Sequence, residues 1–133
     1  MPGRGRGRGR RWRQRGCSRR AVRLLNPALL LLLHQGPAHG YTLIDQLDTY
    51  GLEDINTSVV YRALRDMEEK GWVSSNWEEE QTKGPPRRVY NLTELGDEVL
   101  RWWTRDLRET RQMIDNILEM HARHMEEGEG AHH

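Results

Sequence analysis

One stretch of the sequence carries side chains that could bind a polyanion. Ser58, Tyr61, Arg62 and Arg65 are spaced at i, i+3, i+4 and i+7, which places them on one face of a helix. Arginine can donate two hydrogen bonds to a guanine edge, and hydroxyl groups can bond phosphate oxygens. With Thr57 at the helix start, this face predicts contact with double-stranded DNA. The alternative is an ordinary solvated face.

A second basic group, in a predicted hairpin that follows, could bind the DNA backbone beside this helix. It consists of Lys83, Arg87 and Arg88. The two groups together favour DNA binding over the solvated-face alternative. The acidic run at 78–80 lies in the same hairpin and would repel DNA if it pointed inward. We expect this run to form a solvated face directed away from the DNA.

Other chemistry finds little support in the sequence. His34 and His39 lack metal-ligand spacing, and His121 and His124 lack a further ligand beyond a nearby glutamate. No nucleophile–base pair and no phosphate-binding loop is recognisable. We therefore expect no enzyme activity, no metal and no cofactor. The single cysteine, Cys17, excludes an intramolecular disulfide and fits a reducing compartment.

The charge is distributed unevenly along the chain. Residues 1–23 hold ten arginines and no acid, so 11 of the 21 basic residues remain against all 20 acidic residues, about −9 for the rest. Alternating glycine and arginine predict a disordered arm over residues 1–20 that neutralises phosphates. The alternative is a tail that only improves solubility. The acidic remainder can bind DNA only if its basic residues share one face.

The longest apolar run is too short for a membrane span or a signal peptide. Residues 29–33 are five leucines, whereas a spanning helix needs about 20 apolar residues. We expect a soluble, cytoplasmic protein with no membrane partner.

The elements that would position the basic side chains form a mainly α fold with a small β-hairpin. We expect the first helix over 20–35, with Pro27 as an alternative start, and the second from Tyr41 to Thr49 or Tyr50. The helix with the arginine stripe has Asn56 as its N-cap and ends at Lys70-Gly71. Its buried face consists of Val60, Leu64 and Met67. Strands are expected at 72–77 and 87–92, joined by a polar turn over 78–86.

The last helix is expected from Thr93 to about Met125, without proline. Apolar residues recur along it in steps of three and four, more than one small domain can cover, which predicts a homodimer. The residues of this dimerisation stripe are Val99, Trp103, Leu107, Ile114, Ile117, Leu118 and His121. Trp102 and Trp103 are either packing anchors or part of a pocket for a small-molecule effector.

These elements predict four segments. A disordered Gly/Arg-rich arm would occupy 1–20, and a winged helix-turn-helix DNA-binding domain 21–93. A C-terminal dimerisation helix would follow over 94–126, and a disordered tail over 127–133.

Several segments agree in order and spacing with one known family. They are His39–Ile44, Val60–Leu64, Met67–Val73, Trp77-Glu78, Gly84–Thr93 and Gly96. In these segments the chain resembles the PadR family of transcriptional regulators. The resemblance implies a winged-helix homodimer whose C-terminal helix packs on its counterpart. It also implies repression of nearby genes, often relieved by phenolic acids, drugs or other small effectors near the dimer interface.

The chain departs from the family pattern at three places. Arg62 stands where the family usually has proline, which adds a donor that could contact a base. Asp45 stands where a basic residue is common, and the Gly-Arg arm is not part of the usual pattern.

The leading hypothesis is a homodimeric transcriptional repressor on an inverted-repeat operator, its two recognition helices about 34 Å apart. One alternative is an accessory protein that binds nucleic acid without sequence preference through its arginine-rich arm. Another is a partner-binding dimer without DNA binding, which the acidic balance outside the arm favours.

Overall fold

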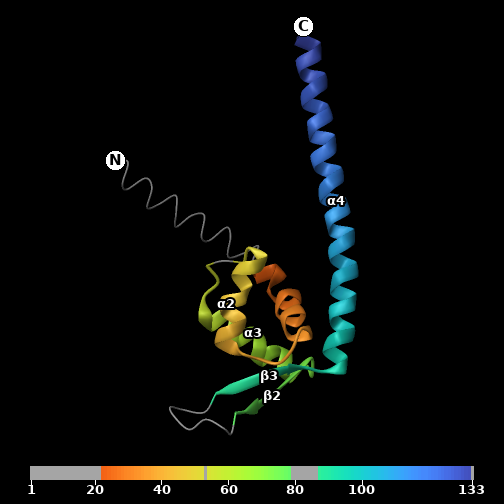
Figure 1. The fold of residues 1–133 in the computed structure, drawn as a ribbon. Helices are drawn as coiled ribbons and strands as arrows, with labels where there is room; N and C mark the ends of the chain where they lie inside the picture. Colours follow the sequence, from red (N-terminus) through yellow and green to blue (C-terminus); the bar gives the residue numbers. More distant parts are fainter. Residues whose placement is uncertain (1–21, 53, 79–86, 133) are drawn as a thin grey trace, which may run out of the picture. The chain divides into compact units, whose positions relative to one another are not determined.

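The computed structural model describes residues 22–52, 54–78 and 87–132, with side chains as far as 128. A helix over 22–34 precedes β1 (Ala38–His39), α2 (Gly40–Leu47), the 3₁₀ turn η1 (Asp48–Tyr50), α3 (Thr57–Glu69), β2 (Val73–Trp77), β3 (Arg88–Leu92) and α4 (Glu94–His132) (Figure 1). The mainly α fold with a small sheet is confirmed. The chain forms two compact units that divide between Leu100 and Arg101. The predicted arm lies outside the described residues.

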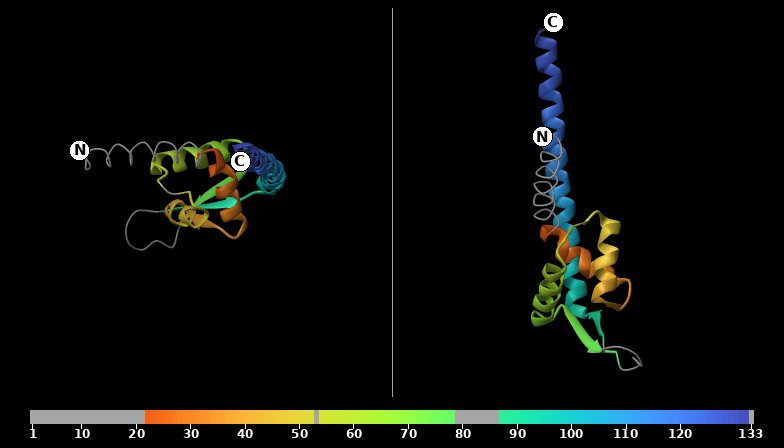
Figure 2. Two further views of the ribbon diagram at one scale, coloured as in Figure 1. Left: turned by 90° about the horizontal axis from the view of Figure 1, so that it is seen from above. Right: turned by 90° about the vertical axis from the view of Figure 1, so that its left-hand side faces the viewer.

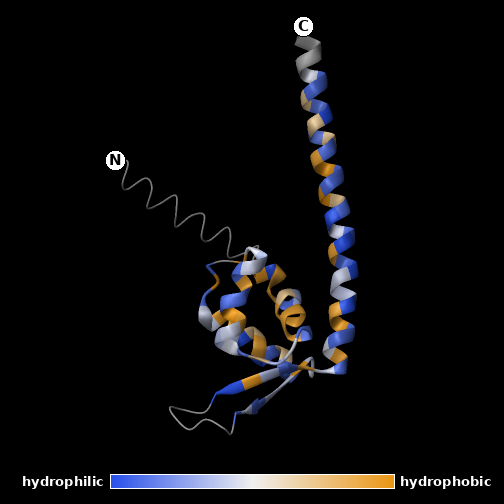
Figure 3. Cartoon of the chain, in the orientation of Figure 1, coloured by the Kyte–Doolittle hydropathy of each residue, from blue (hydrophilic) through white to orange (hydrophobic). Residues whose placement is uncertain are grey.

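The core of the first unit is made of leucines from the first helix packed with apolar residues of α2 and α3. Leu29, Leu30, Leu43 and Leu64 are fully buried. Figure 3 shows hydrophobic residues gathered where these helices meet. Pro27 lies inside the first helix, which is already formed at residue 22, so Pro27 does not begin it.

Both ends of α3 follow local signals. Asn56 Oδ1 accepts a hydrogen bond from the Ser58 backbone N–H at 2.9 Å, which caps the first turn. At the other end Gly71 has a φ of 82°, and Trp72 N donates to Met67 O at 2.9 Å. Together with the Gly71 N–H bond to Glu68 O at 3.0 Å, this is a Schellman motif. The predicted start and end of α3 are confirmed.

The sheet has three antiparallel strands in the order β1-β3-β2. The register pairs Val73 with Leu92 and Ala38 with Tyr90. Both views in Figure 2 show β2 and β3 lying side by side. β2 and β3 each begin one residue later than predicted, and β1 was not predicted at all. The turn over 79–86 lies outside the described residues.

α4 begins with a capped turn that packs tightly on the start of β2. The Gly96 backbone N–H donates to Thr93 Oγ1 at 3.0 Å, and the Thr93 hydroxyl lies 2.6 Å from Gly71 O and 2.9 Å from Trp72 O. A Cβ on Gly96 would collide with the Trp72 carbonyl oxygen. This close approach explains why a glycine stands in the first turn of the helix.

α4 continues past the end predicted near Met125, through residues expected to be a disordered tail, to His132. No proline interrupts this stretch, and its glutamate and alanine residues favour helix. Among the described residues, no helix is long and apolar enough to cross a membrane.

Candidate nucleic-acid interface

The polar face of α3 is open to solvent along the length that was predicted to contact DNA. Thr57, Ser58, Tyr61, Arg62 and Arg65 are all exposed, whereas the opposite face is buried in the core. Neither Arg62 nor Arg65 forms an ion pair with a residue that the structure describes. Their guanidinium groups are therefore available to an external anion. The Ser58 hydroxyl donates to Asn56 Oδ1 at 2.9 Å, so its hydrogen is used by the helix cap.

The two described arginines of the hairpin have partners. Arg87 donates to Tyr41 Oη at 2.9 Å, and its guanidinium lies 5.3 Å from the centre of the Tyr41 ring. Arg88 lies 4.7 Å from the centre of the Trp77 ring and 3.9 Å from a Glu68 carboxylate oxygen. Both side chains are held against the body and keep donors for a further ligand. Lys83 lies outside the described residues.

Glu78 does not form the outward solvated face that was predicted for the acidic run. Its side chain is half-buried, and Oε2 lies 2.6 Å from His39 Nε2. The His39 ring stacks on Tyr41 with 5.2 Å between ring centres and an angle of 13°. The prediction failed because β1 brings His39 next to β3, where Glu78 can reach it. The rest of the acidic run, 79–80, lies outside the described residues.

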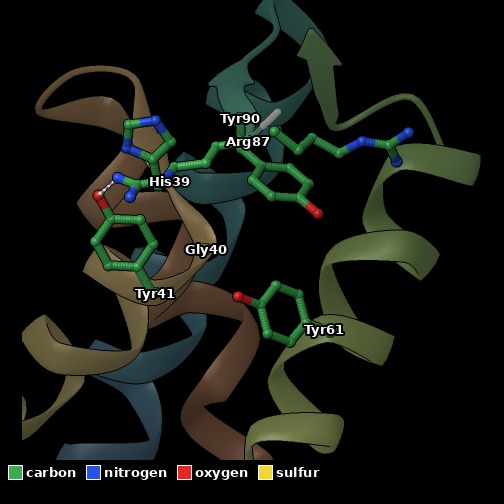
Figure 4. A pocket seen from close by; sticks show the side chains of 7 residues that line it. His39, Gly40, Tyr41, Tyr61, Arg87 and Tyr90 are labelled. Atoms are coloured by element: carbon green, nitrogen blue, oxygen red, sulfur yellow. Dashed lines mark hydrogen bonds between the residues drawn. The ribbon is translucent and has the colours of Figure 1, made fainter. Parts of the chain in front are cut away.

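A small pocket opens between the start of α2, α3 and β3, and we call it the wing pocket. Its volume is about 140 Å³, and it is lined by His39, Gly40, Tyr41, Tyr61, Arg87, Arg88 and Tyr90 (Figure 4). In Figure 4 the Tyr90 hydroxyl points toward α3, whereas the Tyr61 ring reaches from α3 toward Gly40. Gly40 allows this arrangement, because a Cβ there would collide with the Tyr61 ring. Sequence reasoning had assigned His39, Gly40, Tyr41 and Tyr90 no role in a site.

The phenol of Tyr90 is the buried titratable group of this pocket, with 6% of its surface exposed. Burial raises the pKa of Tyr90, and the nearby Arg88 guanidinium offsets part of that rise. Glu68 and Tyr61 act in the same direction as burial. The phenol is therefore neutral at physiological pH and can donate a hydrogen bond.

The predicted dimerisation residues lie on α4 with their side chains partly or largely exposed. Val99 and Leu107 are half-buried, whereas Ile114, Ile117 and Leu118 are 50–68% exposed. His121 is exposed, and so are three methionines that the predicted set left out. They are Met113, Met120 and Met125. These residues recur at helical spacing in the sequence, and Figure 3 shows hydrophobic residues spread along α4.

The two tryptophans of the suggested effector site are neighbours in the second unit. Trp102 is 58% exposed and Trp103 is half-buried. Their rings meet edge to face, with 5.5 Å between centres and an angle of 77°. Within the described parts of the chain, no group of three or more histidine, cysteine or acidic residues is placed to hold a metal ion.

Comparison with known proteins identifies the family to which the chain belongs. Residues 29–102, more than half of the chain, match the profile of the Transcriptional regulator PadR-like family. The chain belongs to the PadR-like family. The resemblance seen in the sequence is thereby confirmed, and the family is one of transcriptional regulators rather than enzymes.

Solved structures agree with this assignment. A PadR family transcriptional regulator from Eggerthella lenta is 30% identical, with a TM-score of 0.58 over 68% of this chain and 80% of that one. A PadR-like transcription factor from Bacteroides fragilis is 28% identical, with a TM-score of 0.63 over 75% and 95%. A PadR family transcription regulator from Clostridium difficile is 25% identical, with a TM-score of 0.64 over 71% and 98%. No curated protein matches the chain.

The chain is thus a PadR-like transcriptional regulator with a winged-helix fold. The exposed face of α3 and the wing pocket share Tyr61. The roles of the individual residues remain predictions.

Proposed function

We propose that this PadR-like protein is a homodimeric repressor that binds an inverted-repeat operator. The observation that carries the proposal is the exposed row of Tyr61, Arg62 and Arg65 on α3, whose arginines have no acidic partner among the described residues. An α-helix fits the major groove of DNA, where arginine can bind guanine through two hydrogen bonds. Arg87 and Arg88 of the hairpin would bind the flanking backbone, and Lys83 would join them.

The dimer is supported by the exposed apolar residues of α4. Ile114, Ile117 and Leu118 expose half or more of their surface, and burying the rest of each against a second copy would contribute about 1–2 kcal/mol. A two-fold dimer presents two copies of α3, so its operator is an inverted repeat with half-sites about 34 Å apart. An effector that binds at Trp102 and Trp103 would relieve repression by changing this pairing. The exposed edge-to-face rings offer it an aromatic surface.

The test begins with the operator, which is found by pulling down genomic DNA with the purified protein and sequencing it. Arg62→Ala is then compared with the wild type on operator DNA and on random DNA of equal length. If Arg62 contacts a base, the operator affinity falls about tenfold to a hundredfold more than the random-DNA affinity. Binding is measured by fluorescence anisotropy at one fixed salt concentration, because salt changes both affinities.

The matched control is Arg108→Ala, which removes an exposed arginine from α4 instead of α3. It should change the two affinities equally and only slightly. Equal losses on operator and random DNA for Arg62→Ala would remove its base-reading role. Failure of the wild type to enrich any genomic site would overturn the proposed function itself.

A further inference from the structure

We infer that the wing pocket is a binding site for one phosphate group. The inference rests on the proposed function in so far as the DNA backbone is one source of that phosphate. It goes further because it assigns binding roles to Tyr41 and Gly40 and admits a free phosphate ester as a competitor of DNA.

The side chains that line the wing pocket come from three elements. Tyr41 lies on α2, Tyr61 on α3 and Arg87 next to β3. Tyr41 Oη accepts the bond from Arg87, so the Tyr41 hydroxyl hydrogen remains available to donate. Tyr61 makes no hydrogen bond to a described residue, and Figure 4 shows its ring reaching toward Gly40.

The charge of the pocket also favours an anion. Arg87 has no acidic partner among the described residues, and its bond to the Tyr41 hydroxyl supplies no counter-charge. Arg88 lies 3.9 Å from Glu68, at the outer limit of an ion pair, while the Glu68 carboxylate also accepts a 2.6 Å bond from Ser75 Oγ. Hydrogen bonds from charged donors to phosphate are among the stronger ones in proteins.

The shape of the pocket depends on the glycine at the start of α2. At about 140 Å³ the space is large enough for a phosphate group. A Cβ at position 40 would collide with the Tyr61 ring, so the ring would have to move. Gly40→Ala is therefore a variant that changes the shape of the pocket without removing any donor.

Two sources can supply the phosphate. One is a backbone phosphate of the operator, because the pocket adjoins Tyr61 on the face of α3 that is proposed to enter the groove. The other is a free phosphate monoester, which would then displace DNA. The chemistry at the pocket is the same, and two experiments separate the sources.

The first experiment replaces single operator phosphates by uncharged methylphosphonates, one position at a time. For the wild type, one position in each half-site should weaken binding about tenfold, as expected for a lost charge-assisted hydrogen bond. Tyr61→Phe, Tyr41→Phe and Gly40→Ala should bind intact operator DNA and operator DNA with the methylphosphonate at that position with nearly equal affinity. Tyr50→Phe, which changes an exposed tyrosine outside the pocket, should keep the wild-type penalty. Circular dichroism checks that each variant is folded.

The second experiment titrates the full-length protein with inorganic phosphate and with glycerol phosphate, using NMR of carbon-13-labelled tyrosine rings. A free phosphate source predicts saturable shifts of the Tyr41 and Tyr61 signals that Gly40→Ala abolishes. It also predicts displacement of DNA beyond that caused by sodium chloride of equal ionic strength.

If only the first experiment gives its expected result, the DNA backbone is the source of the phosphate. If only the second does, the source is a free phosphate ester. Intact operator binding with neither result overturns the phosphate pocket and leaves the proposed function standing. If no operator exists, the proposed function fails and the titration alone decides the pocket.

Discussion

The two units of the protein differ in whether the apolar side chains of their helices are buried or exposed. In the first unit, Val60, Leu64 and Met67 on α3 are completely buried by neighbouring elements of the same chain. In the second unit, Ile117 and Leu118 on α4 are 68% and 61% exposed. The two helices are comparably amphipathic, so the difference lies in what their chain supplies to cover them.

The comparison indicates that the units draw their stability from different sources. The winged helix has a core of its own. Along the second unit the polar side-chain contacts of the described residues include local pairs such as Gln112 with Asn116 at 3.0 Å and Arg123 with Glu119 at 2.7 Å. Each such pair adds only about 0.2–0.5 kcal/mol. A second copy of the chain is the partner we propose for the apolar face.

The largest effect should come from paired truncations of a leucine in each unit. Leu64→Ala should lower the free energy of unfolding by about 2–5 kcal/mol, because it leaves a cavity in a packed core. Leu118→Ala should instead shift the monomer–dimer equilibrium toward monomer and leave the core of the winged helix intact. Urea unfolding and sedimentation equilibrium at several protein concentrations measure the two quantities.

Either of two results would contradict this difference between the buried face of α3 and the exposed face of α4. If Leu118→Ala leaves the dissociation constant of the dimer unchanged, the exposed face of α4 is not the pairing surface. If Leu64→Ala proves neutral, the buried face of α3 is not part of a tight core.

Alanine substitutions of two glycines on α4 should change the stability by smaller amounts and in opposite directions. Gly96→Ala should destabilise the first unit by about 1–3 kcal/mol, since its Cβ would collide with the Trp72 carbonyl and lie 2.7 Å from Leu92 Cδ1. A Cβ at Gly128 would meet no atom within 4 Å, so Gly128→Ala should stabilise the helix by up to about 1 kcal/mol. Thermal unfolding of both variants compares the two sites. Equal shifts would show that helix propensity alone determines both results.

Sequence reasoning located the elements whose ends carry local signals. Asn56 and Gly71 define the bounds of α3 through a side-chain cap and a left-handed residue, so both could be found without tertiary contacts. β1 could not be found in this way, because two residues after Pro37 show no alternation. Its existence depends on pairing with Val89 and Tyr90, about fifty residues further along the chain.

The candidate site was predictable to the same extent. The α3 face follows from helical spacing, and its residues are exposed as predicted, although their binding roles are untested. The contacts of Glu78 with His39 and of Arg87 with Tyr41 depend on the position of β1, so they could not be inferred. The acidic run was expected to face solvent because it would repel DNA, and the contact of Glu78 with His39 could not be seen from the order of residues along the chain.

The smallest effect concerns the buried phenol of the first unit. Because burial raises the pKa of Tyr90, the unfolded chain ionises first, near the usual tyrosine pKa of about 10. The stability due to the neutral phenol is therefore complete below that pH and is lost as the pH rises through the folded-state pKa. Tyr90→Phe should make the alkaline fall in unfolding free energy shallower, measured by urea unfolding at several pH values. Tyr50→Phe is the control for the loss of one exposed phenol, and the same slope in Tyr90→Phe and wild type would contradict the burial effect.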